Sequence, residues 1–455
     1  MNDGHGLIIM VRVTDERAYR RFMAFLFISV ALGALTDGVD STASSTAPFS
    51  LIPGLHITTT QFGFAASILY VGGIFGALSF GWIADKIGRR NTFVASLAMM
   101  SVFEFASAFV INYTSLVLLR FLVGFAVGAD YANGATYFNE FSRKQTRGRN
   151  YFWWFGTFAI GTVVMGLLAI VMFPLGKTEW RYLFAVTAIP SAIGAIMRLK
   201  LPESPRYLVG KSRVDDAKRS LMQAHLDPND VGTFAVAPTL KGKSQLQMMR
   251  PYIFGITIPM FLVAYFINVP LTSVGLLSPL YLGVLKIKPP TTVLFTLFAF
   301  NIPITLGAFF GSAFVDRFGR YTNLVISSVG GCVCIMAMAF LAHPSTVYVL
   351  LAFQAVGSIL IWFGTPVVYS IATELYPVSI RGAGEGINIT GTRLAGFFGP
   401  FIGTVLLTDF NLFTVFIFDA IMLLFMFLVV VFWSGKRIET KNEEIEDAVA
   451  RIEGV

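Results

Sequence analysis

The chain has 455 residues, of which 55% are hydrophobic and only 13% are charged, and its mean hydropathy is +0.70. Since about a quarter of the residues in soluble domains are charged, this composition excludes an ordinary soluble protein and indicates a membrane protein. The excess of 34 Lys and Arg over 26 Asp and Glu is not gathered in a basic patch with interleaved aromatic residues, so we expect no nucleic-acid partner.

Twelve apolar segments are long enough to cross a lipid bilayer. A helix needs about 20 apolar residues to span a hydrocarbon layer of about 30 Å. Such segments lie at 22–47, 61–84, 92–112, 114–138, 151–174 and 181–200, and then at 253–283, 291–314, 322–342, 346–371, 384–408 and 411–433. The sequence therefore predicts an all-α membrane protein with twelve transmembrane helices.

Basic residues are distributed unevenly over the loops between these spans. Most lie before the first span and in every second loop, including the long stretch from Arg198 to Arg250. The intervening loops hold only Lys177, Arg181, Lys286 and Lys288. Because loops rich in Lys and Arg stay in the cytoplasm, we expect a multi-pass protein of the plasma membrane with both termini in the cytoplasm.

The spans form two related groups. The segment 81–90 (GWIADKIGRR) recurs as 312–321 (SAFVDRFGRY), and after the fourth span of each group an acid precedes an Arg-Gly pair by seven residues. We therefore divide the chain into a six-helix half at 1–200, a cytoplasmic linker at 201–250 with an amphipathic helix near 215–224, a second six-helix half at 251–433, and a cytoplasmic tail at 434–455. Paired repeats are typical of secondary transporters, whose substrate site lies between the halves.

Three motifs together resemble the major facilitator superfamily. They are the two repeated Gly-x-x-x-Asp-Lys/Arg-x-Gly-Arg loops, Arg120-x-x-x-Gly124, and 202–208 (PESPRYL). They are most similar to the branch that holds sugar porters, aromatic-acid and phosphate symporters, and organic-ion transporters. The resemblance covers nearly the whole chain and implies two pseudo-symmetric six-helix halves that work by alternating access. Ser312 departs from the pattern, which has Gly there, and we expect looser helix packing at this point.

Charged residues within the first and fourth spans are candidates for proton coupling, since an ionisable group at mid-bilayer costs about 3 kcal/mol. Asp37 and Asp40 share one helical face. Asp40 lies about 27 Å from the cytoplasmic end of its span, and Arg120 lies about 10 Å below the outer surface, so the two can meet. An aspartate beside a fixed arginine binds or releases a proton as burial and pairing change. We expect these three residues to couple transport to protons, and a purely structural ion pair is the alternative.

The resemblance implies the same pairing. Asp37-Gly-Val-Asp40 is similar to the Asp-Gly-x-Asp of aromatic-acid symporters, and Gly38-Val-Asp40 is similar to the Gly-aromatic-Asp of proton-coupled sugar porters. In both groups the aspartate of the first helix pairs with the arginine of the fourth.

Arg393 is the candidate for anion binding. It lies about 14 Å deep in the 384–408 span, close to the midplane, and no carboxylate lies within one turn of it along the helix. A guanidinium binds carboxylates and phosphates with two parallel hydrogen bonds, and 391–396 is similar to the organic anion transporters. We expect Arg393 to bind a substrate carboxylate, and an internal pair with Asp37 or Asp130 is the alternative.

Further substrate contacts are expected from three spans. Gly128-Ala-Asp130-Tyr131 is similar to the Gly-Gly-Asp-Tyr of phosphate symporters, and Asn133 can share the face of Asp130. Trp154 offers either a flat apolar wall for the substrate or an anchor at the lipid interface. Asn268 lies in the 253–283 span, which its three prolines predict to be broken or kinked beside a cavity. The amide-rich run of sugar porters is missing from this span, which counts against a hexose.

Charged residues beside the cytoplasmic ends of the spans are expected to form gates. Exposed ion pairs contribute at most about 1 kcal/mol, which suits contacts that break in each transport cycle. The resemblance implies that these pairs close the cytoplasmic side, and topological anchoring by positive charge alone is the alternative. The expected gate pairs are Asp85 with Arg89 and Arg90, Asp316 with Arg320, Glu140 with Arg147, and Glu374 with Arg381.

The sequence predicts a proton-coupled symporter of a small organic anion. The four histidines lie near loops or span ends, and the two cysteines lie together in one apolar run, so we expect no catalytic residues, no metal site and no cofactor. The expected partners are a small-molecule substrate, protons and the lipid bilayer, with the protein as a monomer. The alternatives are a sugar symporter of the same fold, then a phosphate symporter or drug exporter, and finally a receptor built on the same scaffold.

Overall fold

The computed structural model describes residues 12–142, 147–234, 248–288, 291–376 and 380–433. These residues are almost entirely helical, and within them the sole β pairing is an isolated antiparallel bridge between Val13 and Leu226. Nine helical stretches of the described chain are long and apolar enough to cross a membrane. One of these, Gly156–Arg198, holds two of the predicted spans, and α4 and α16 supply two more. The predicted all-α fold with twelve long helical spans is confirmed.

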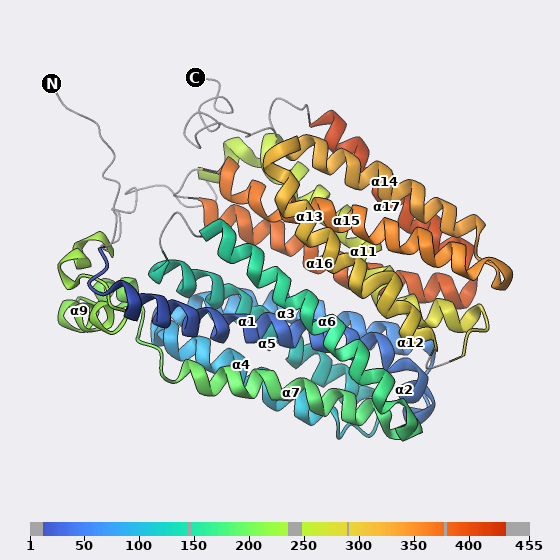
Figure 1. Ribbon diagram of the computed structural model, residues 1–455, viewed down its shortest axis with the longest axis horizontal. Coiled ribbons are helices and arrows are strands. Elements are labelled where there is room, and N and C mark those ends of the chain that lie inside the picture. Colours follow the sequence, from blue (N-terminus) through green and yellow to red (C-terminus); the bar gives the residue numbers. More distant parts are fainter. Residues whose placement is uncertain (1–11, 143–146, 235–247, 289–290, 377–379, 434–455) are drawn as a thin grey trace.

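The helices form two packed groups, which appear as two layers in Figure 1. The first group comprises α1 (Glu16–Thr46), α2 (Pro48–Leu55), α3 (Thr59–Ile87), α4 (Arg89–Ser107), α5 (Tyr113–Phe141), α6 (Arg147–Met172) and α7 (Glu179–Arg198). The second comprises α11 (Ile258–Val284), α12 (Thr291–Thr296), α13 (Ile302–Phe318), α14 (Arg320–Phe340), α15 (Val347–Leu375), α16 (Arg381–Asp409) and α17 (Leu412–Phe432). Short helices α8 (Pro205–Gly210) and α9 (Val214–Gln223) lie between the groups in sequence.

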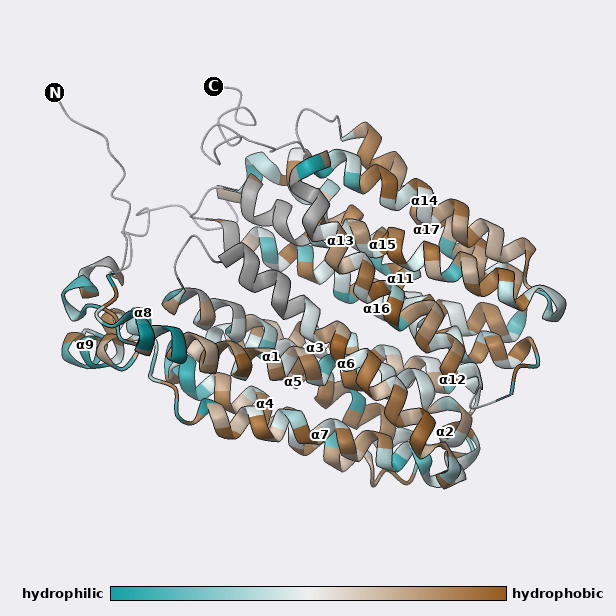
Figure 2. Ribbon diagram, viewed as in Figure 1, coloured by the Kyte–Doolittle hydropathy of each residue, from teal (hydrophilic) through white to brown (hydrophobic). Residues whose placement is uncertain are grey.

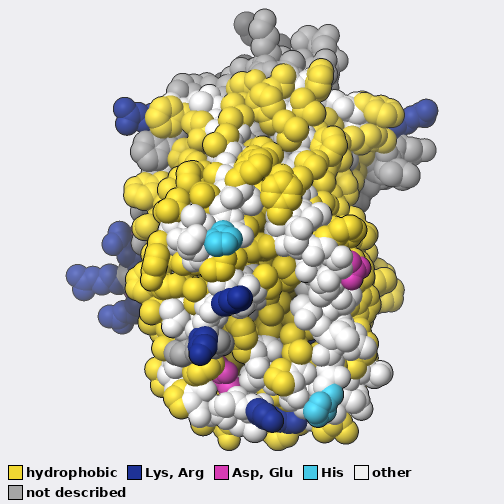
Figure 3. Space-filling model, turned by 90° about the vertical axis from the view of Figure 1, so that its right-hand side faces the viewer, with side chains coloured by type: hydrophobic (Ala, Val, Ile, Leu, Met, Phe, Trp, Pro, Cys, Tyr) yellow, Lys and Arg dark blue, Asp and Glu magenta, His cyan; other side chains and the backbone are white. Residues whose placement is uncertain are grey.

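The long helices run between two ends of the molecule, which we call the α9 end and the α2 end after the short helices found there (Figure 1). In Figure 2 the long helices are mostly hydrophobic, whereas α8 and α9 are hydrophilic. Figure 3 looks onto the α2 end and shows mostly hydrophobic and uncharged atoms with few Lys and Arg side chains. The amphipathic helix expected near 215–224 is present as α9.

Local sequence signals fix where several helices begin. Thr58 and Gln61 form a reciprocal capping box at the start of α3, and Asn112 and Ser115 do the same for α5. Each box satisfies backbone N–H groups that the first helical turn leaves unpaired. Gly88 and Gly319, the equivalent glycines of the two sequence repeats, have φ of 104° and 85° and precede α4 and α14. The repeat therefore encodes the same sharp joint in both halves.

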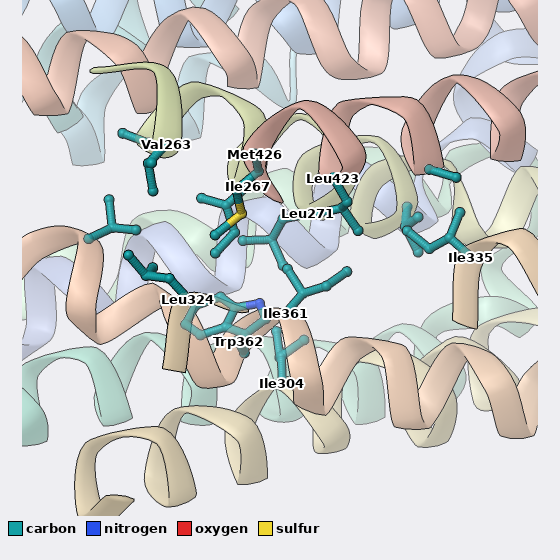
Figure 4. Close-up of a cluster of buried hydrophobic side chains, with 14 of the residues drawn as sticks. Val263, Ile267, Leu271, Ile304, Leu324, Ile335, Ile361, Trp362, Leu423 and Met426 are labelled. Atoms are coloured by element: carbon teal, nitrogen blue, oxygen red, sulfur yellow. The ribbon is translucent and has the colours of Figure 1, made fainter. Parts of the chain in front are cut away.

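The second half is held together by a large hydrophobic cluster between α11, α14, α15 and α17. Figure 4 shows its centre, where Ile267 and Leu271 of α11 lie close to Ile361 of α15 and Leu423 of α17. The outer faces of the helices are also apolar: Leu78, Val333 and Phe432 are each at least 60% exposed. Apolar surface of this extent is expected where lipid replaces water around a helix bundle.

The two halves meet mainly through α3 with α16, α6 with α13, and α1 with α11. Toward the α2 end they are joined by a hydrogen bond of 3.2 Å between the hydroxyls of Thr60 and Thr408. Phe64 of α3 packs edge-on against the rings of Phe397 and Phe401 of α16. These contacts seal the halves together at the α2 end.

Of the two alternatives predicted for the proline-rich span, broken or kinked, the structure excludes a break. The helix α11 is continuous from Ile258 to Val284, with Pro270 and Pro279 inside it. Pro259 lies in its first turn. A single π-helical turn at Ile253–Thr257 precedes the helix instead.

Candidate functional site

A cavity of about 200 Å³ lies between the two halves. Its wall comes from α1, α3, α5 and α6 on one side and from α11, α15, α16 and the π-helical turn Leu297–Asn301 on the other. Ionisable, amide and aromatic side chains make up much of this wall, namely Asp37, Asp40, Tyr70, Tyr131, Phe158, Asn268, Phe300, Asn301, Trp362, Glu385 and Arg393. A small molecule in this position would touch both halves at once.

Asp40 and Arg120 meet, as the sequence predicts. The Nη1 of Arg120 donates to Oδ1 of Asp40 at 2.7 Å and to Oγ of Ser44 at 3.1 Å. Asp40 and Arg120 are both only 2% exposed. The guanidinium also lies 4.5 Å from the ring centre of Phe184 in α7. Asp40 alone of this pair lines the cavity, so it is the member that water or substrate can reach.

A third ionisable group, which sequence reasoning left without a role, completes this cluster. Glu104 of α4 is fully buried and accepts a hydrogen bond from Nη2 of Arg120 at 3.2 Å. Thr187 of α7 donates to the same Glu104 oxygen at 2.8 Å. The position of an acid within an apolar span was the available signal, but the sequence did not show which helix it faces.

Asp37, Tyr131 and Arg393 form a second polar group, which bridges the halves. The hydroxyl of Tyr131 in α5 donates to Oδ2 of Asp37 in α1 at 2.8 Å. The Arg393 guanidinium of α16 lies 5.1 Å from the ring centre of Tyr131. No carboxylate of the described residues lies within 4 Å of the Arg393 guanidinium nitrogens, so the direct pairs with Asp37 or Asp130 considered above are not formed.

Asp130 belongs to a different site from the one expected. It pairs with the fully buried Arg198 at the end of α7, and Ser96 donates to its Oδ1 at 2.8 Å. Neither Asp130 nor Asn133 lines the cavity, and the Asn133 amide donates to the carbonyl of Ala129 in its own helix. In this structure Asp130 therefore faces the packing between α1, α4, α5 and α7.

Placing Arg198 among the loop cations is wrong. Its Nη1 donates to the carbonyl of Phe93 at 2.7 Å and its Nε to the carbonyl of Ser29 at 3.2 Å. With Asp130 these acceptors satisfy a guanidinium that would otherwise be very costly to bury. A residue at the end of an apolar run looks like a loop cation in the sequence, and only the tertiary fold supplies its partners.

Several cavity residues come from the second half. Asn268 of α11 lines the cavity as expected, with its amide donating to the carbonyl of Ala264, and Thr272 of the same helix lines it too. Asn301, which was not predicted, lies in a π-helical turn, a feature common at functional sites. Its amide donates to the carbonyl of Thr162 in α6 at 3.2 Å. Glu385 was missed because it lies in the first turn of its predicted span, where an acid resembles an ordinary helix-end residue.

The cluster at the α9 end has different pairs from those predicted. Arg89 at the start of α4 pairs with Glu140 at the end of α5, and Ser204 hydrogen-bonds the same carboxylate. The backbone N–H of Arg90 donates to Glu203 at 2.8 Å. The expected pairing of Asp85 with these arginines is not formed, because Asp85 is exposed on the last turn of α3. These contacts tie α4 and α5 to the segment before α8.

Other predicted residues fall outside the described side chains. This applies to Trp154 of α6 and to Arg147, Asp316, Glu374 and Arg381. Arg320 is described and begins α14 directly after Gly319.

The sequence matches the family model described as "Sugar (and other) transporter" over residues 23–450. The chain belongs to this family. Structures of the E. coli xylose transporter XylE, described in one case as a proton:xylose symporter, have the same fold as this chain. For that symporter structure the TM-score is 0.72 at 18% identity, covering 95% of this chain and 99% of XylE. The fold is therefore that of the major facilitator superfamily.

Two curated relatives are similar along most of their length. A D-xylose transporter from Levilactobacillus brevis is 27% identical over 462 residues, covering 94% of this chain and 95% of the relative. The niacin transporter NiaP from Acinetobacter baylyi is 25% identical over 391 residues, covering 84% of this chain and 87% of the relative. The chain is thus a membrane transporter of the major facilitator superfamily, in the sugar porter branch.

Proposed function

We propose that this protein is a proton-coupled symporter of a small sugar. The observation that carries the proposal is the cavity between the halves, whose wall combines amides, hydroxyls and aromatic rings with ionisable side chains that include Asp37 and Asp40. The sugar transporter family match and the xylose-transporting relative support this substrate class. The preferred sequence prediction, an organic anion, becomes the second candidate.

The charge of the cavity wall argues for a neutral substrate. Among the described lining residues, Asp37 and Glu385 bring two acidic groups against the single guanidinium of Arg393, while Asp40 is already paired with Arg120. With both acids ionised, a substrate carboxylate would enter a site with excess negative charge, where repulsion costs binding free energy. A neutral polyol avoids this cost and uses the same groups as hydrogen-bond partners.

Aromatic and amide side chains supply the contacts that a sugar needs. Phe158 of α6 and Trp362 of α15 face each other across the two halves with ring centres 6.1 Å apart and planes tilted by 22°. Flat rings of this kind cover the apolar faces of a sugar ring, while Asn268 and Asn301 can bind its hydroxyls. Because the ligands come from both halves, binding can influence how the halves are arranged.

Transport would follow from rocking of the two halves about this cavity. We place the α9 end on the cytoplasmic side of the plasma membrane, because the loops rich in Lys and Arg lie at that end. The contacts between α3 and α16 then close the outer side, so the structure corresponds to a state closed toward the exterior. The Arg89–Glu140 pair joins two helices of the first half and is formed in this state, so it does not by itself close the inner side.

A proton would enter at Asp40. When the cavity is wet, Asp40 can exchange a proton with water, and its protonation weakens the bond to Arg120. Asp37, on the same helix, is connected to the second half by its hydrogen bond from Tyr131 and by the contact of the Tyr131 ring with Arg393. A change in charge in the first half can therefore affect the position of α16. The proton and the sugar would therefore bind on one side and leave together on the other.

An organic acid is the second candidate because of Arg393. Its guanidinium lines the cavity and lies 5.1 Å from the ring centre of Tyr131. No carboxylate of the described chain lies within 4 Å of its nitrogens. A carboxylate substrate would bind there if Asp37 were protonated first. The relative NiaP, described as a niacin transporter, supports this possibility.

A substrate screen separates the two candidates. The purified protein in proteoliposomes with an acidic exterior is given radiolabelled D-xylose, D-glucose, nicotinate, benzoate and phosphate in turn. The proposal predicts accumulation of at least one sugar above its external concentration, and collapse of that accumulation when a protonophore removes the gradient. Accumulation of a carboxylate with no uptake of sugars would replace the proposal by the second candidate.

A further inference from the structure

Two carboxyl groups share one guanidinium inside the first half. Arg120 of α5 donates through Nη1 to Asp40 of α1 at 2.7 Å and through Nη2 to Glu104 of α4 at 3.2 Å. None of the three side chains is more than 3% exposed. The other groups around Glu104 are neutral: Thr187 donates to it from α7, and Ser107 of its own helix accepts from Arg120.

The formal charges of this cluster do not cancel if both acids are ionised. Two carboxylates and one guanidinium leave a net negative charge in a dry, buried place, which is strongly unfavourable. With one proton on either acid the cluster is neutral. Oε1 of Glu104 is buried with no hydrogen-bond partner in the described chain, so this carboxylate is poorly solvated and any additional negative charge on the cluster is costly.

We propose that Asp40 and Glu104 form one proton-binding pair across Arg120, so that Glu104 is the second acid of the coupling site. This inference rests on the proposed proton-coupled function and adds a residue to it. Asp40 lines the cavity and exchanges the proton with water, whereas Glu104 is closed off from the cavity. Glu104 acts through Asp40 and Arg120, as a positioning and charge-setting residue.

The pair explains how Arg120 can stay neutralised throughout the cycle. When a proton binds Asp40, the carboxylate of Glu104 remains as the counter-ion of Arg120, and the loaded cluster is neutral. When the proton returns to cavity water, both carboxylates bind the guanidinium and the cluster carries one extra negative charge. That extra charge makes the unloaded cluster less stable and favours the return of a proton to it.

The test is Glu104→Gln in the full-length protein. Glutamine keeps the size of the side chain and its carbonyl can still accept from Thr187 and Arg120, while the charge is lost. We measure proton binding without any substrate, by infrared absorption of the protonated carboxyl groups of purified protein across a pH series. Asp40→Asn identifies the absorption that belongs to Asp40. We expect Glu104→Gln to shift the titration midpoint of Asp40 to lower pH by about one to two units.

A matched control tests for a purely structural effect. Ser101→Ala lies on the same helix and removes a neutral hydrogen bond to the carbonyl of Ala188 in α7, so it should leave the midpoint unchanged. The pH profile of gradient-driven uptake should shift with Glu104→Gln in the same direction. An unchanged Asp40 midpoint in Glu104→Gln would overturn the inference. If wild-type uptake proves independent of the proton gradient while the infrared shift is seen, the proposed function fails and the proton pair stands.

Discussion

Tyr131 contacts two charged residues that belong to different halves. Its hydroxyl donates to Asp37 of α1, and its ring lies against the Arg393 guanidinium of α16. A cation over an aromatic face contributes about 0.5 to 2 kcal/mol, and a hydrogen bond to a charged group contributes about 1.5 to 3 kcal/mol. One side chain thus links the charge of Asp37 to the position of α16.

Tyr131→Phe separates these two contacts. The variant keeps the ring against Arg393 and loses the hydrogen bond to Asp37, so we expect gradient-driven uptake to fall about tenfold or more while substrate exchange without a gradient falls less. Radiotracer uptake and counterflow in proteoliposomes measure the two activities. Equal losses of gradient-driven uptake and of substrate exchange would mean that Tyr131 contributes to substrate binding and not to proton coupling. The matched control is Tyr265→Phe in α11, because Tyr265 is not one of the residues that line the cavity.

The contact between Asp40 and Arg120 could be predicted because helical rise alone sets the depth of each residue. The partners of Glu104 and Arg198 could not be predicted in this way. Their contacts depend on the rotation of α4 and α7 about their own axes, which apolar sequence does not fix when all faces of a span are hydrophobic. Because the rotation of α5 was also unknown, Asp130 was predicted to contact the substrate, whereas in the structure it pairs with Arg198.

The helices α3 and α5 pack closely because glycines line their interface. A Cβ on Gly124 of α5 would lie 1.8 Å from the carbonyl oxygen of Leu69, and one on Gly72 of α3 would lie 2.1 Å from that of Phe121. Small residues let membrane helices approach in this way, since packing replaces the hydrophobic effect between them. This contact holds Arg120, on the same helix as Gly124, at its depth beside Asp40.

Gly124→Ala should therefore destabilise the first half. The new methyl group meets backbone and cannot be relieved by a side-chain rotation, so we expect a loss of about 1 to 3 kcal/mol. Thermal unfolding of the detergent-solubilised protein, followed by tryptophan fluorescence, measures the effect as a lower Tm. Gly81→Ala is the control, because a Cβ there meets nothing within 4 Å. A Gly124→Ala Tm equal to that of the control would contradict this packing account.

The segment before α1 is bound to the linker at the α9 end. The backbone N–H of Arg12 donates to Asp230 at 2.7 Å and the Arg12 guanidinium at 3.1 Å, while Asp227 donates its backbone N–H to the carbonyl of Arg12 at 2.8 Å. Partial burial raises the pKa of Asp230, but the hydrogen bonds and charge of Arg12 outweigh it and leave the pKa below its ordinary value.

This lowered pKa gives the contact a defined pH dependence. An acid whose pKa is depressed in the folded state contributes stability above its ordinary pKa, and that contribution is lost as the pH falls through the depressed value. We expect the backbone amides of Thr14 and Asp227 to stay protected from hydrogen exchange at neutral pH and to lose protection only below about pH 4. In Asp230→Asn they should be less protected at neutral pH, and the difference from the wild-type protein should disappear below about pH 4. Equal protection in both proteins would show that the ion pair is not responsible.

Helix positions were predictable from hydropathy, because each span must cover the same hydrocarbon thickness. The continuous course of α11 could not be predicted from the sequence. Each proline leaves a backbone carbonyl without its helical N–H partner, and the number of prolines does not show whether that carbonyl finds another donor. The pairing of Arg89 with Glu140 was also missed, because charges at neighbouring helix ends offer several equivalent pairs in sequence.

At the scale of the whole molecule, the two halves form separate packed units with a polar cavity between them. Sequence alone predicted the paired halves from the repeat, assigned Asp37 and Asp40 to proton coupling, and assigned Asn268 and Arg393 to substrate binding. All four line the cavity. The preference for an organic anion rested on an isolated Arg393, and the structure places this cation in a wall that also carries Asp37 and Glu385.

The most direct test of the account is proton-driven accumulation by Asp40→Asn. The amide keeps the size of the side chain and cannot take up a proton at physiological pH. In proteoliposomes with an imposed pH gradient, we expect the wild-type protein to concentrate its sugar inside and the variant only to equilibrate it, while both exchange labelled for unlabelled sugar. Gradient-driven accumulation by Asp40→Asn at the wild-type level would show that Asp40 does not couple transport to protons.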